Sequence, residues 1–318
     1  MNILALDFGG TRMRAAWYKL SADGALAQQQ RAETATQATD PPDTVINRLI
    51  ALGRQVIPAG AVPDELGIAA PGPHDAATGV IHHTFTLPGW HEVPLGAILS
   101  AAFGCPVTMQ NDGNLGALAE YRGGAGRGCN PMLYMTISTG IGGGVIINGD
   151  LFTGWSGLAA EPGHVMVTTP EGERVRLEAI ASGTAIGDRA RRLLASGNSD
   201  SSLRTAPVID GAAVGHAAQQ GDAFALSVVR TAGEYLGLGM VSLLHLFSPE
   251  AIIIGGSVAK LGDLLFDPAR EVINAHVLNP RFVPPDLIRL AQHGENVCLI
   301  GAAWWAAQAS ERRTSTHH

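Results

Sequence analysis

The stretch Leu4–Arg12, with the sequence LALDFGGTR, decides the fold because it joins an apolar strand to a glycine turn. A second strand-like run, Met13–Leu20, follows, where a dinucleotide-binding loop would require a helix. Glycines let backbone N–H groups approach an anion closely, and the Thr11 hydroxyl can donate to a phosphate oxygen. Asp7 lies at the mouth of the turn, where it could orient a hydrated magnesium ion. We interpret the stretch as a phosphate-binding hairpin; an ordinary β-turn is the alternative.

A second unit of the same kind occurs more than a hundred residues later. The apolar strand Met132–Ile137 runs into the turn Ser138–Gly144, then into Val145–Ile147 and an Asn148-Gly149 hairpin signal. No Gly-Lys-Ser/Thr closes either segment, which excludes a P-loop. Two such hairpins in one chain indicate a duplicated architecture and resemble the ATPase domains of actin, hexokinase and Hsp70. In those folds one hairpin from each lobe holds the nucleotide phosphates.

Composition limits the possible classes of protein. The 318 residues are 46% hydrophobic and 15% charged, which is typical of a folded chain with real cores. The net charge of −7, without a dense Lys/Arg block, argues against a nucleic-acid partner. The apolar runs are too short or too interrupted to span a bilayer, so no membrane is expected. Cys105, Cys129 and Cys298 are scattered, which favours the reducing cytoplasm and no disulfides.

Strands alternate with helical segments along the chain, which predicts an α/β protein with mixed sheets. We expect a two-lobed actin-like (ribonuclease H-like) ATPase fold, with duplicated βββαβα lobes and a central cleft. Residues 1–113 would form the smaller N-terminal lobe, joined by a C-terminal helix over 301–318, and residues 114–300 the larger lobe. The other segments with helical patterns are Asp43–Ile57, Val93–Phe103, Leu115–Tyr121, Val175–Leu194 and Ala223–Phe247.

Several motifs in order resemble the ROK (repressor, open reading frame, kinase) family of bacterial sugar kinases. They span almost the whole chain and are Asp7–Thr11, Pro71–Pro73, Leu87–Trp90, Asn111-Asp112 with Glu120, Ser138–Gly144, Glu161–His164, Leu177–Gly183 and Gly255–Ser257. The resemblance implies transfer of the γ-phosphoryl group of ATP, with Mg²⁺, to a hexose hydroxyl. It also implies a homodimer.

Asp112 is the candidate catalytic base, because a sugar hydroxyl must lose its proton as it attacks phosphorus. A carboxylate at a strand end can be held within reach of that proton, although the same residue could simply cap the helix that follows. Asn111 would hydrogen-bond a sugar hydroxyl in this interpretation. Asp7 would orient magnesium through water.

Glu161 and His164 lie in a Gly/Pro-rich loop, where polar side chains can converge on a polyol. Glu178, at the start of a predicted helix, matches another sugar-binding glutamate of the family, and the resemblance also places Gly72 at the substrate. Each could instead be a solvated loop residue or a charge at a helix N-terminus. The candidate phosphate and nucleotide contacts are Gly9, Gly10, Thr11, Thr139, Gly140, Gly142 and Gly143, with Gly255 and Gly256 beneath the adenosine.

The chain departs from the family at the zinc segment. Many ROK proteins bind zinc through three closely spaced cysteines and the histidine that corresponds to His164, but residues 165–177 contain no cysteine. We therefore expect no structural zinc. His82 and His83 are adjacent on a predicted strand, so their side chains should point to opposite faces and are not expected to be metal ligands.

The acceptor sugar remains open at this point. Glucose is the first choice, but the strings at Ser138–Gly144 and Glu178–Gly183 are similar to those of N-acetylmannosamine kinases. N-acetylglucosamine, mannose and fructose are further alternatives, and polyphosphate could replace ATP. A sugar-binding protein without catalytic activity is an alternative function. Family repressors carry a helix-turn-helix before the first hairpin, and here that hairpin begins at Asn2, so we expect an enzyme.

Overall fold

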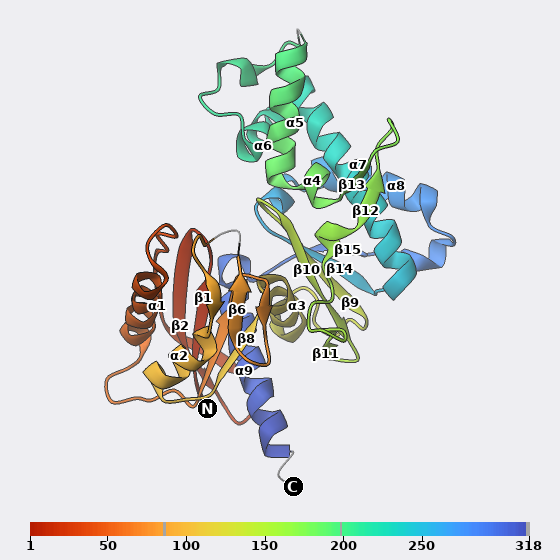
Figure 1. Cartoon of the computed structure of the whole chain (residues 1–318). Helices are drawn as coiled ribbons and strands as arrows, with labels where there is room; N and C mark the ends of the chain where they lie inside the picture. The colour runs from red at the N-terminus through yellow and green to blue at the C-terminus, as the bar shows by residue number, and fades with distance from the viewer. Residues whose placement is uncertain (85–86, 198, 316–318) are drawn as a thin grey trace. The chain divides into compact units, whose positions relative to one another are not determined.

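The computed structural model describes residues 1–84, 87–197 and 199–315, so residues 316–318 of the expected C-terminal helix lie outside it. The chain divides into two compact units, one formed by Met1–Arg122 with Glu295–His318 and the other by Gly123–Gly294 (Figure 1). Helix α3 (Asp112–Gly123) belongs mainly to the first unit because it packs against α9 (Val297–Ser315), with the Arg122 guanidinium 5.3 Å from the Trp304 ring centre.

The first unit contains a five-stranded sheet in the order β3-β2-β1-β4-β8. Its first three strands are antiparallel neighbours, and β4 and β8 run parallel to β1. The strands are β1 (Asn2–Phe8), β2 (Arg12–Leu20), β3 (Leu26–Ala35), β4 (Glu65–Ala69) and β8 (Val107–Gln110). Residues 3–8 of β1 are all buried, as expected for a strand covered on both faces.

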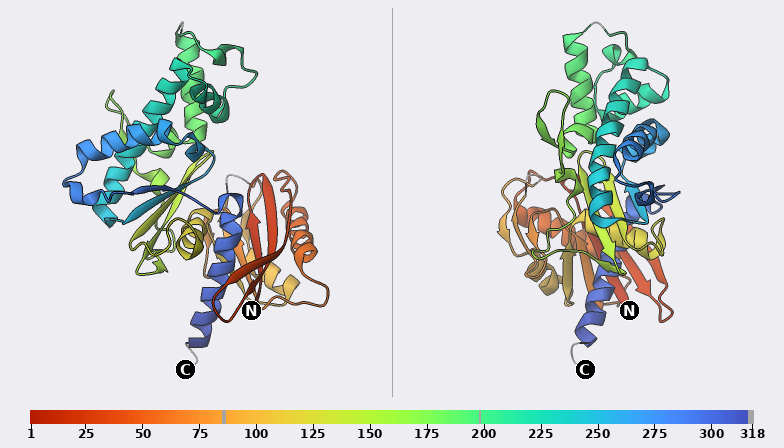
Figure 2. Two further views of the ribbon diagram at one scale, coloured as in Figure 1. Left: turned by 180° about the vertical axis from the view of Figure 1, so that it is seen from behind. Right: turned by 90° about the vertical axis from the view of Figure 1, so that its right-hand side faces the viewer.

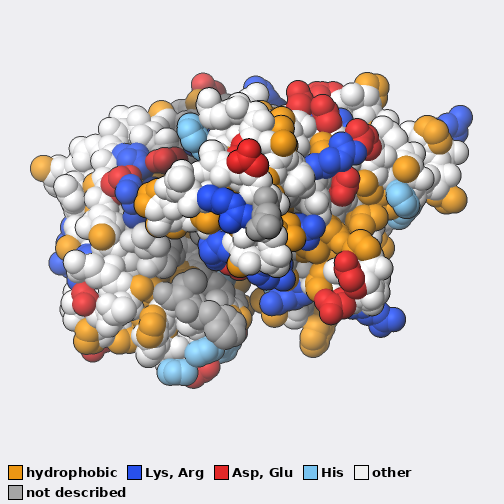
Figure 3. Space-filling view, turned by 90° about the horizontal axis from the view of Figure 1, so that it is seen from above, with side chains coloured by type: hydrophobic (Ala, Val, Ile, Leu, Met, Phe, Trp, Pro, Cys, Tyr) orange, Lys and Arg blue, Asp and Glu red, His pale blue; other side chains and the backbone are white. Residues whose placement is uncertain are grey.

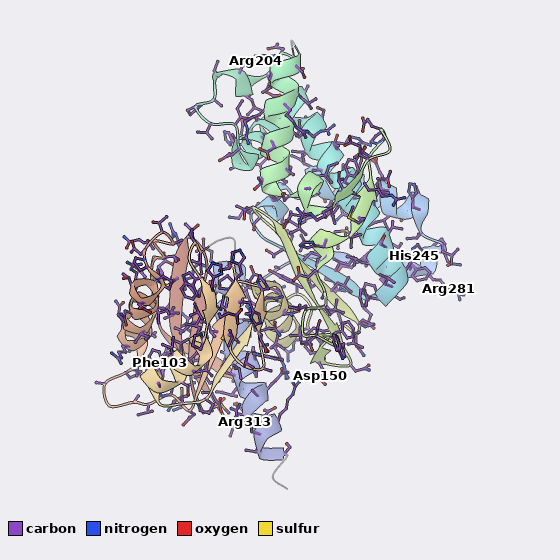
Figure 4. All side chains as sticks on the ribbon, in the orientation of Figure 1. Phe103, Asp150, Arg204, His245, Arg281 and Arg313 are labelled. Carbon is purple, nitrogen blue, oxygen red and sulfur yellow. The ribbon has the colours of Figure 1, made fainter. Side chains whose placement is uncertain are left out.

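Helices cover both faces of this sheet, and Figure 2 shows α9 along one face and α1 (Pro42–Val56) along the other. Leu4, Leu6 and Phe8 face α1 and α2 (Leu95–Phe103), whereas Ile3 and Ala5 face α9, which is the alternation that a pleated strand imposes. Gly67 of β4 leaves room for α9, since a Cβ there would lie 1.9 Å from the Ala302 carbonyl oxygen. Arg313, labelled in Figure 4, pairs with the buried Glu65 from the end of α9.

A three-stranded sheet, β5-β6-β7, follows the Pro71–Pro73 loop. Its strands are β5 (His74–Asp75), β6 (Val80–His83) and β7 (His91–Val93). Val93 therefore belongs to a strand, and α2 begins two residues later than the helix predicted from Val93. His82 and His83 are exposed, in agreement with their interpretation as surface residues.

The second unit repeats the topology of the first, with the strand order β11-β10-β9-β14-β15. The strands are β9 (Met132–Ile137), β10 (Ile141–Ile147), β11 (Asp150–Leu151), β14 (Ala251–Gly255) and β15 (Ile288–Leu290). Asn148 and Gly149 both have positive φ at the β10–β11 hairpin, as predicted. This repetition confirms the predicted duplicated α/β fold.

The helices of the second unit include α7 (Ala223–Phe247) and α8 (Asp263–His276), which pack against each other. The long helix predicted over Val175–Leu194 is wrong. The segment contains the end of β13 (Arg174–Arg176), then α4 (Glu178–Ala181) and α5 (Gly183–Ser196). The break falls at Ser182, whose extended backbone caps α5 by accepting a 3.2 Å hydrogen bond from the Ala185 N–H.

The described surface mixes charges of both signs. On the face that Figure 3 shows, Lys and Arg side chains are interspersed with Asp and Glu side chains. Among the described residues, no helix has both the length and the apolar character that crossing a bilayer would require.

Candidate functional site

In the first unit, the predicted site residues gather at one edge of the sheet. Asp7, Ala69 and Gln110 lie in one row at the carboxyl ends of the parallel strands β1, β4 and β8. The chain segments that follow these strands carry the other predicted residues of this unit, which are Gly9, Gly10, Thr11, Gly72, Asn111 and Asp112. Ligands of open α/β sheets bind at this edge.

The first glycine turn is closed by hydrogen bonds that the sequence did not reveal. The Gly9 N–H donates to the Arg12 carbonyl oxygen at 3.0 Å. Thr36, fully buried just after β3, donates its hydroxyl to the Gly9 carbonyl oxygen at 2.6 Å and its N–H to the Thr11 carbonyl oxygen at 2.9 Å. Thr36 therefore fixes the turn from the neighbouring strand, which leaves Thr11 exposed.

Asp7 has a cationic partner that the sequence analysis missed. Arg14 lies directly across the β1–β2 ladder, and its Nη1 donates to the Asp7 Oδ2 at 2.9 Å. Burial raises the pKa of the Asp7 carboxyl, and Arg14 opposes that shift. Arg14 also approaches Glu33 of β3 at 3.7 Å. The available signal was the pairing register of the hairpin, which places these three residues side by side.

Asp112 is the first residue of α3, and its surroundings are fixed by buried amides. Asn111 caps the helix, since its Oδ1 accepts a 2.7 Å hydrogen bond from the Asn114 N–H. The Gln110 Oε1 accepts from the Asn111 N–H at 2.9 Å and from the Asn114 Nδ2 at 3.2 Å, and both Gln110 and Asn114 are buried. Asp112 keeps solvent access, but the protein packed around it raises the pKa of its carboxyl, and the Gly113 N–H offsets this only in part.

In the second unit, the turn after β9 is held by backbone contacts. The Ser138 N–H donates to the Gly140 carbonyl oxygen at 2.9 Å, and the Gly183 N–H donates to the Ser138 carbonyl oxygen at 2.7 Å. Glu178 lies against the same turn, because its Oε2 accepts a 2.9 Å hydrogen bond from the Ile141 N–H. A Cβ at Gly140 would lie 2.4 Å from that carboxylate oxygen, so a side chain there would displace the Glu178 carboxylate.

The loop that carries Glu161 and His164 packs on β10. Its short 3₁₀ turn η1 (Pro162–His164) approaches so closely that a Cβ on Gly163 would lie 2.2 Å from the Ile141 carbonyl oxygen. Ala160 has a positive φ of 67°, a conformation that costs a residue with a Cβ about 1 kcal/mol. Glu161 and His164 are both exposed, so the loop presents their side chains beside the turn that Glu178 contacts.

Gly255 and Gly256 end β14 beside the same turn. Gly255 pairs with Thr136. Gly256 has a φ of +89°, and a Cβ there would lie only 2.2 Å from the Ile137 carbonyl oxygen, so a side chain does not fit. A cavity of about 470 Å³ opens next to them. It is lined by Ser138, Thr139, Gly183, Thr184, Asp210, Gly211, Ala212, Gly215, His216, Gln219, Ser257, Val258, Lys260 and Leu261. The sequence analysis missed its wall from α6 (Gly211–Gln219), which carries no motif.

Each of the two sheets has a glycine turn at its carboxyl edge. In the first unit a carboxylate at the start of a helix lies at this edge, and in the second unit a cavity lies beside the turn. The sequence profile of the ROK family matches residues 3–309. The chain belongs to the ROK family. As a ROK protein, it is 33% identical over 315 residues to a glucokinase of Thermotoga maritima, covering 95% of this chain and 96% of that one.

Solved structures of ROK proteins agree with the fold. A ROK hexokinase from Thermus thermophilus superposes with a TM-score of 0.80 at 28% identity, over 98% of this chain and all of that chain. A ROK glucokinase from Streptomyces griseus, in complex with glucose and AMPPNP, gives a TM-score of 0.78 at 29% identity, over 97% and 100% of the two chains.

In this ROK protein a short hairpin occupies residues 165–177, the segment that contains no cysteine. Strands β12 (Met166–Thr168) and β13 (Arg174–Arg176) pair, and the Leu177 N–H donates to the Val165 carbonyl oxygen at 2.8 Å. This pairing brings the chain after His164 back to Glu178. Within residues 1–84, 87–197 and 199–315, no group of three His, Cys, Asp or Glu side chains is arranged to hold a metal ion.

Proposed function

We propose that this ROK protein transfers the γ-phosphoryl group of ATP to a hexose hydroxyl, with glucose converted to glucose 6-phosphate as the first candidate reaction. The observation that carries the proposal is the placement of Asp112, a carboxylate with a raised pKa at the carboxyl edge of the first sheet, beside the Asp7 turn. A raised pKa makes the ionised carboxylate a better proton acceptor near neutral pH. Relatives named as glucokinases support glucose as the acceptor.

For the acceptor, Asn111 and Gly72 of the first unit and Glu161 and His164 of the second would bind the sugar hydroxyls. A carboxylate that accepts hydroxyl donors discriminates between epimers, because a misplaced hydroxyl leaves it unpaired. Glu178 would contribute as well, although it also supports the turn at Ile141. N-acetylmannosamine is the second candidate, since the strings around Ser138 and Glu178 are similar to those of such kinases.

For the donor, the two glycine turns would bind phosphates through Gly9, Gly10 and Thr11 and through Thr139, Gly140, Gly142 and Gly143. The cavity next to Gly256 is large enough for a nucleoside, and Lys260 is the one Lys or Arg among its lining residues. A polyphosphate chain would gain nothing from this cavity and would require more cationic side chains. These features favour ATP over polyphosphate.

Asp7 would orient Mg²⁺ through water, since a buried carboxylate beside phosphates suits a hydrated ion. Arg14 donates to the Asp7 Oδ2, which opposes the rise that burial causes in the pKa of that carboxyl. The metal would supply charge neutralisation for the transferring phosphoryl group. No structural zinc is included in the proposal.

The test is a coupled assay of ADP release over a panel of sugars, with ATP and polyphosphate as donors. The panel holds glucose, mannose, fructose, N-acetylglucosamine and N-acetylmannosamine. We expect ATP with glucose to give the highest kcat/KM. A higher value for another sugar would reassign the acceptor, and binding of sugar without turnover on any member would establish a silent sugar-binding protein.

We also propose that the protein acts in the cytoplasm as a homodimer, by analogy with the family. Light scattering coupled to size exclusion would give the mass of the assembly directly. A mass equal to that of one 33.0 kDa chain at micromolar concentration would contradict the dimer.

A further inference from the structure

Thr36 is a fully buried polar residue that no motif of the sequence marked. It lies directly after β3, and β3 runs parallel to β1, since each of these two strands is antiparallel to β2. The ends of β1 and β3 therefore share one edge of the sheet, where the first glycine turn leaves β1. From this position Thr36 reaches two peptide groups of the turn, through its 2.6 Å hydroxyl bond to the Gly9 carbonyl and its 2.9 Å N–H bond to the Thr11 carbonyl.

The hydrogen bond to the Gly9 carbonyl also fixes the direction of the next N–H group. The peptide between Gly9 and Gly10 is trans and planar, so its N–H points away from its C=O. Because Thr36 holds that C=O on the side of β3, the Gly10 N–H is turned to the opposite side. The Thr11 N–H belongs to the next peptide, which lies between the two carbonyls that Thr36 holds.

These two N–H groups are available to a ligand. Among the described residues, neither the Gly10 N–H nor the Thr11 N–H donates to an oxygen of the protein. Thr11 is exposed and Gly10 is partly exposed, so both donors can be reached from solvent. The Gly9 N–H is not available, since it closes the turn on the Arg12 carbonyl oxygen at 3.0 Å. Consecutive backbone donors of this kind suit an anion such as a phosphate group.

Helix α1 supports Thr36 in turn. The Arg48 Nη1 donates to the Thr36 carbonyl oxygen at 2.5 Å, and the Arg48 Nη2 donates to the Asp40 Oδ2 at 2.6 Å. The planar guanidinium thus bridges the backbone directly after β3 and a carboxylate four residues later. Hydrogen bonds that involve a charged group are the stronger kind, so they fix the chain at Thr36 against α1.

We propose that Thr36 is a positioning residue for the donor nucleotide, which orients the Gly10 and Thr11 N–H groups toward the phosphates of ATP, and that Arg48 holds Thr36 in place. This inference rests on the proposed role of the first turn in binding these phosphates. Preorganised donors bind more tightly, because they do not have to be ordered when the ligand arrives. The Thr36 hydroxyl also polarises the peptide to which it donates, which strengthens the Gly10 N–H as a donor.

The binding test is calorimetry of the whole chain with two ligands, AMPPNP and glucose. Thr36→Val keeps the shape of the side chain and removes the hydroxyl, whereas Thr36→Ser keeps the hydroxyl. We expect AMPPNP to bind Thr36→Val about tenfold more weakly, since a hydrogen bond to a charged group is worth about tenfold or more in affinity. Thr36→Ser should retain most of the AMPPNP affinity. Thr34→Val is the matched control, because Thr34 lies two residues earlier on β3 and its hydroxyl has no hydrogen-bond partner among the described residues.

Glucose binding separates positioning from packing. Asn111 and Gly72, the proposed glucose contacts of the first unit, would both be affected by a general loosening of that unit, so we expect glucose affinity to stay within about twofold of wild type in Thr36→Val. Equal losses for the two ligands, or unchanged AMPPNP affinity in folded Thr36→Val, would overturn the proposal.

Arg48→Gln tests the same proposal without a change in the buried core. It removes the bridge between Thr36 and Asp40, and we expect about threefold weaker AMPPNP binding with unchanged glucose binding. Arg54→Gln is the control, since Arg54 is an exposed arginine of the same helix. Unchanged AMPPNP affinity in Arg48→Gln would contradict the supporting role of Arg48.

Amide hydrogen exchange, followed by NMR, observes the two donors directly. In the wild type the Gly10 and Thr11 N–H groups should exchange rapidly without nucleotide and be protected by saturating AMPPNP, and this protection should be smaller in Thr36→Val and in Arg48→Gln. Equal protection in the wild type and both variants would refute the positioning by Thr36. Absence of protection in a wild type that binds AMPPNP would instead refute the role of the first turn in phosphate binding, so the two failures are distinguishable.

Discussion

The two units share a strand order, 3-2-1-4-5 in each sheet, and both place a glycine turn at the carboxyl edge, yet they hold these turns differently. The turn of the first unit is fixed by side chains, with Thr36 beneath it and the Asp7–Arg14 pair at its mouth. The turn of the second unit is fixed by backbone contact, in which Gly163, Gly183 and Gly256 approach within distances that exclude a Cβ. We call the first unit the charged half, because polar and charged side chains hold its turn, and the second unit the close-packed half, because close backbone contacts hold its turn.

This difference suggests that the two units contribute different functions to the proposed reaction. Ionisable groups in the first unit, Asp7 and Asp112, suit the handling of metal and proton. Close-packed glycines and a cavity in the second unit suit binding by shape and by backbone N–H groups. Substitutions should therefore affect turnover most in the first unit, and stability together with substrate KM most in the second.

Asp112→Asn tests the charged half most severely. We expect kcat to fall by about 10²- to 10⁴-fold because the attacking hydroxyl loses its proton acceptor, with little change in sugar affinity or circular dichroism. Asp75→Asn is the matched control, since Asp75 ends the short strand β5 and its carboxylate accepts from the N–H groups of Ala77 and Thr78. Turnover within threefold of wild type in Asp112→Asn would remove Asp112 from the role of base.

Gly256→Ala tests the close-packed half. A Cβ there would lie 2.2 Å from the Ile137 carbonyl oxygen at a φ of +89°, so we expect a loss of about 3 kcal/mol in the free energy of unfolding and a raised KM for ATP. Gly24→Ala is the control, because its φ of +83° is similar but no atom lies within 4 Å. Chemical denaturation of both variants gives the comparison, and equal losses would show that strain alone, not close packing, decides the result.

Glu178 allows a finer test, since it is the carboxylate of the close-packed half that contacts the turn. Glu178→Gln keeps an oxygen that can accept from the Ile141 N–H, whereas Glu178→Ala leaves that donor unpaired at a cost of about 1–3 kcal/mol. We expect Gln to preserve the free energy of unfolding but to raise the glucose KM about tenfold through loss of a charge-assisted hydrogen bond. A wild-type KM in the Gln variant would limit Glu178 to a structural role.

The pH dependence of stability should have opposite signs in two aspartates, one from each unit. The protein packed around Asp112 raises the pKa of its carboxyl although the side chain keeps solvent access. The charged form is therefore disfavoured in the fold, and Asp112→Asn should raise the Tm slightly at pH 8 with a gain that disappears in acid. Partial burial of Asp222 is outweighed by hydrogen bonds from Ala225, Ser202 and Ser201, which lower its pKa to about 2. Asp222→Asn should lower the Tm at neutral pH, and the wild type should lose this contribution as the pH falls from about 4 towards 2. Calorimetry over a range of pH measures the change in Tm that each substitution causes. Changes of the same sign at neutral pH would contradict the opposite pKa shifts of the two aspartates.

The sequence was sufficient to predict features that depend on a few neighbouring residues. Both glycine turns, the Asn148-Gly149 hairpin and helix α7 were predicted because turn residues and apolar periodicity act over a few neighbours. The order of the motifs was sufficient for the family and the duplicated fold.

Contacts between strands were not predicted from the sequence. Arg14 reaches Asp7 through the register of the β1–β2 hairpin, and Thr36 reaches the first turn from the end of β3. Ser182 splits a segment with continuous helical character because its side chain caps α5. The α6 wall of the cavity has no distinctive residues, so only the tertiary fold identifies it.

The most direct test of the account is whether the turns of both units act on the same donor. Thr11→Val and Thr139→Val each remove one exposed hydroxyl from one turn, and KM for ATP is measured for each variant beside KM for glucose. The account predicts that both variants raise the ATP KM while the glucose KM stays close to that of the wild type. An ATP KM unchanged in either variant would contradict it.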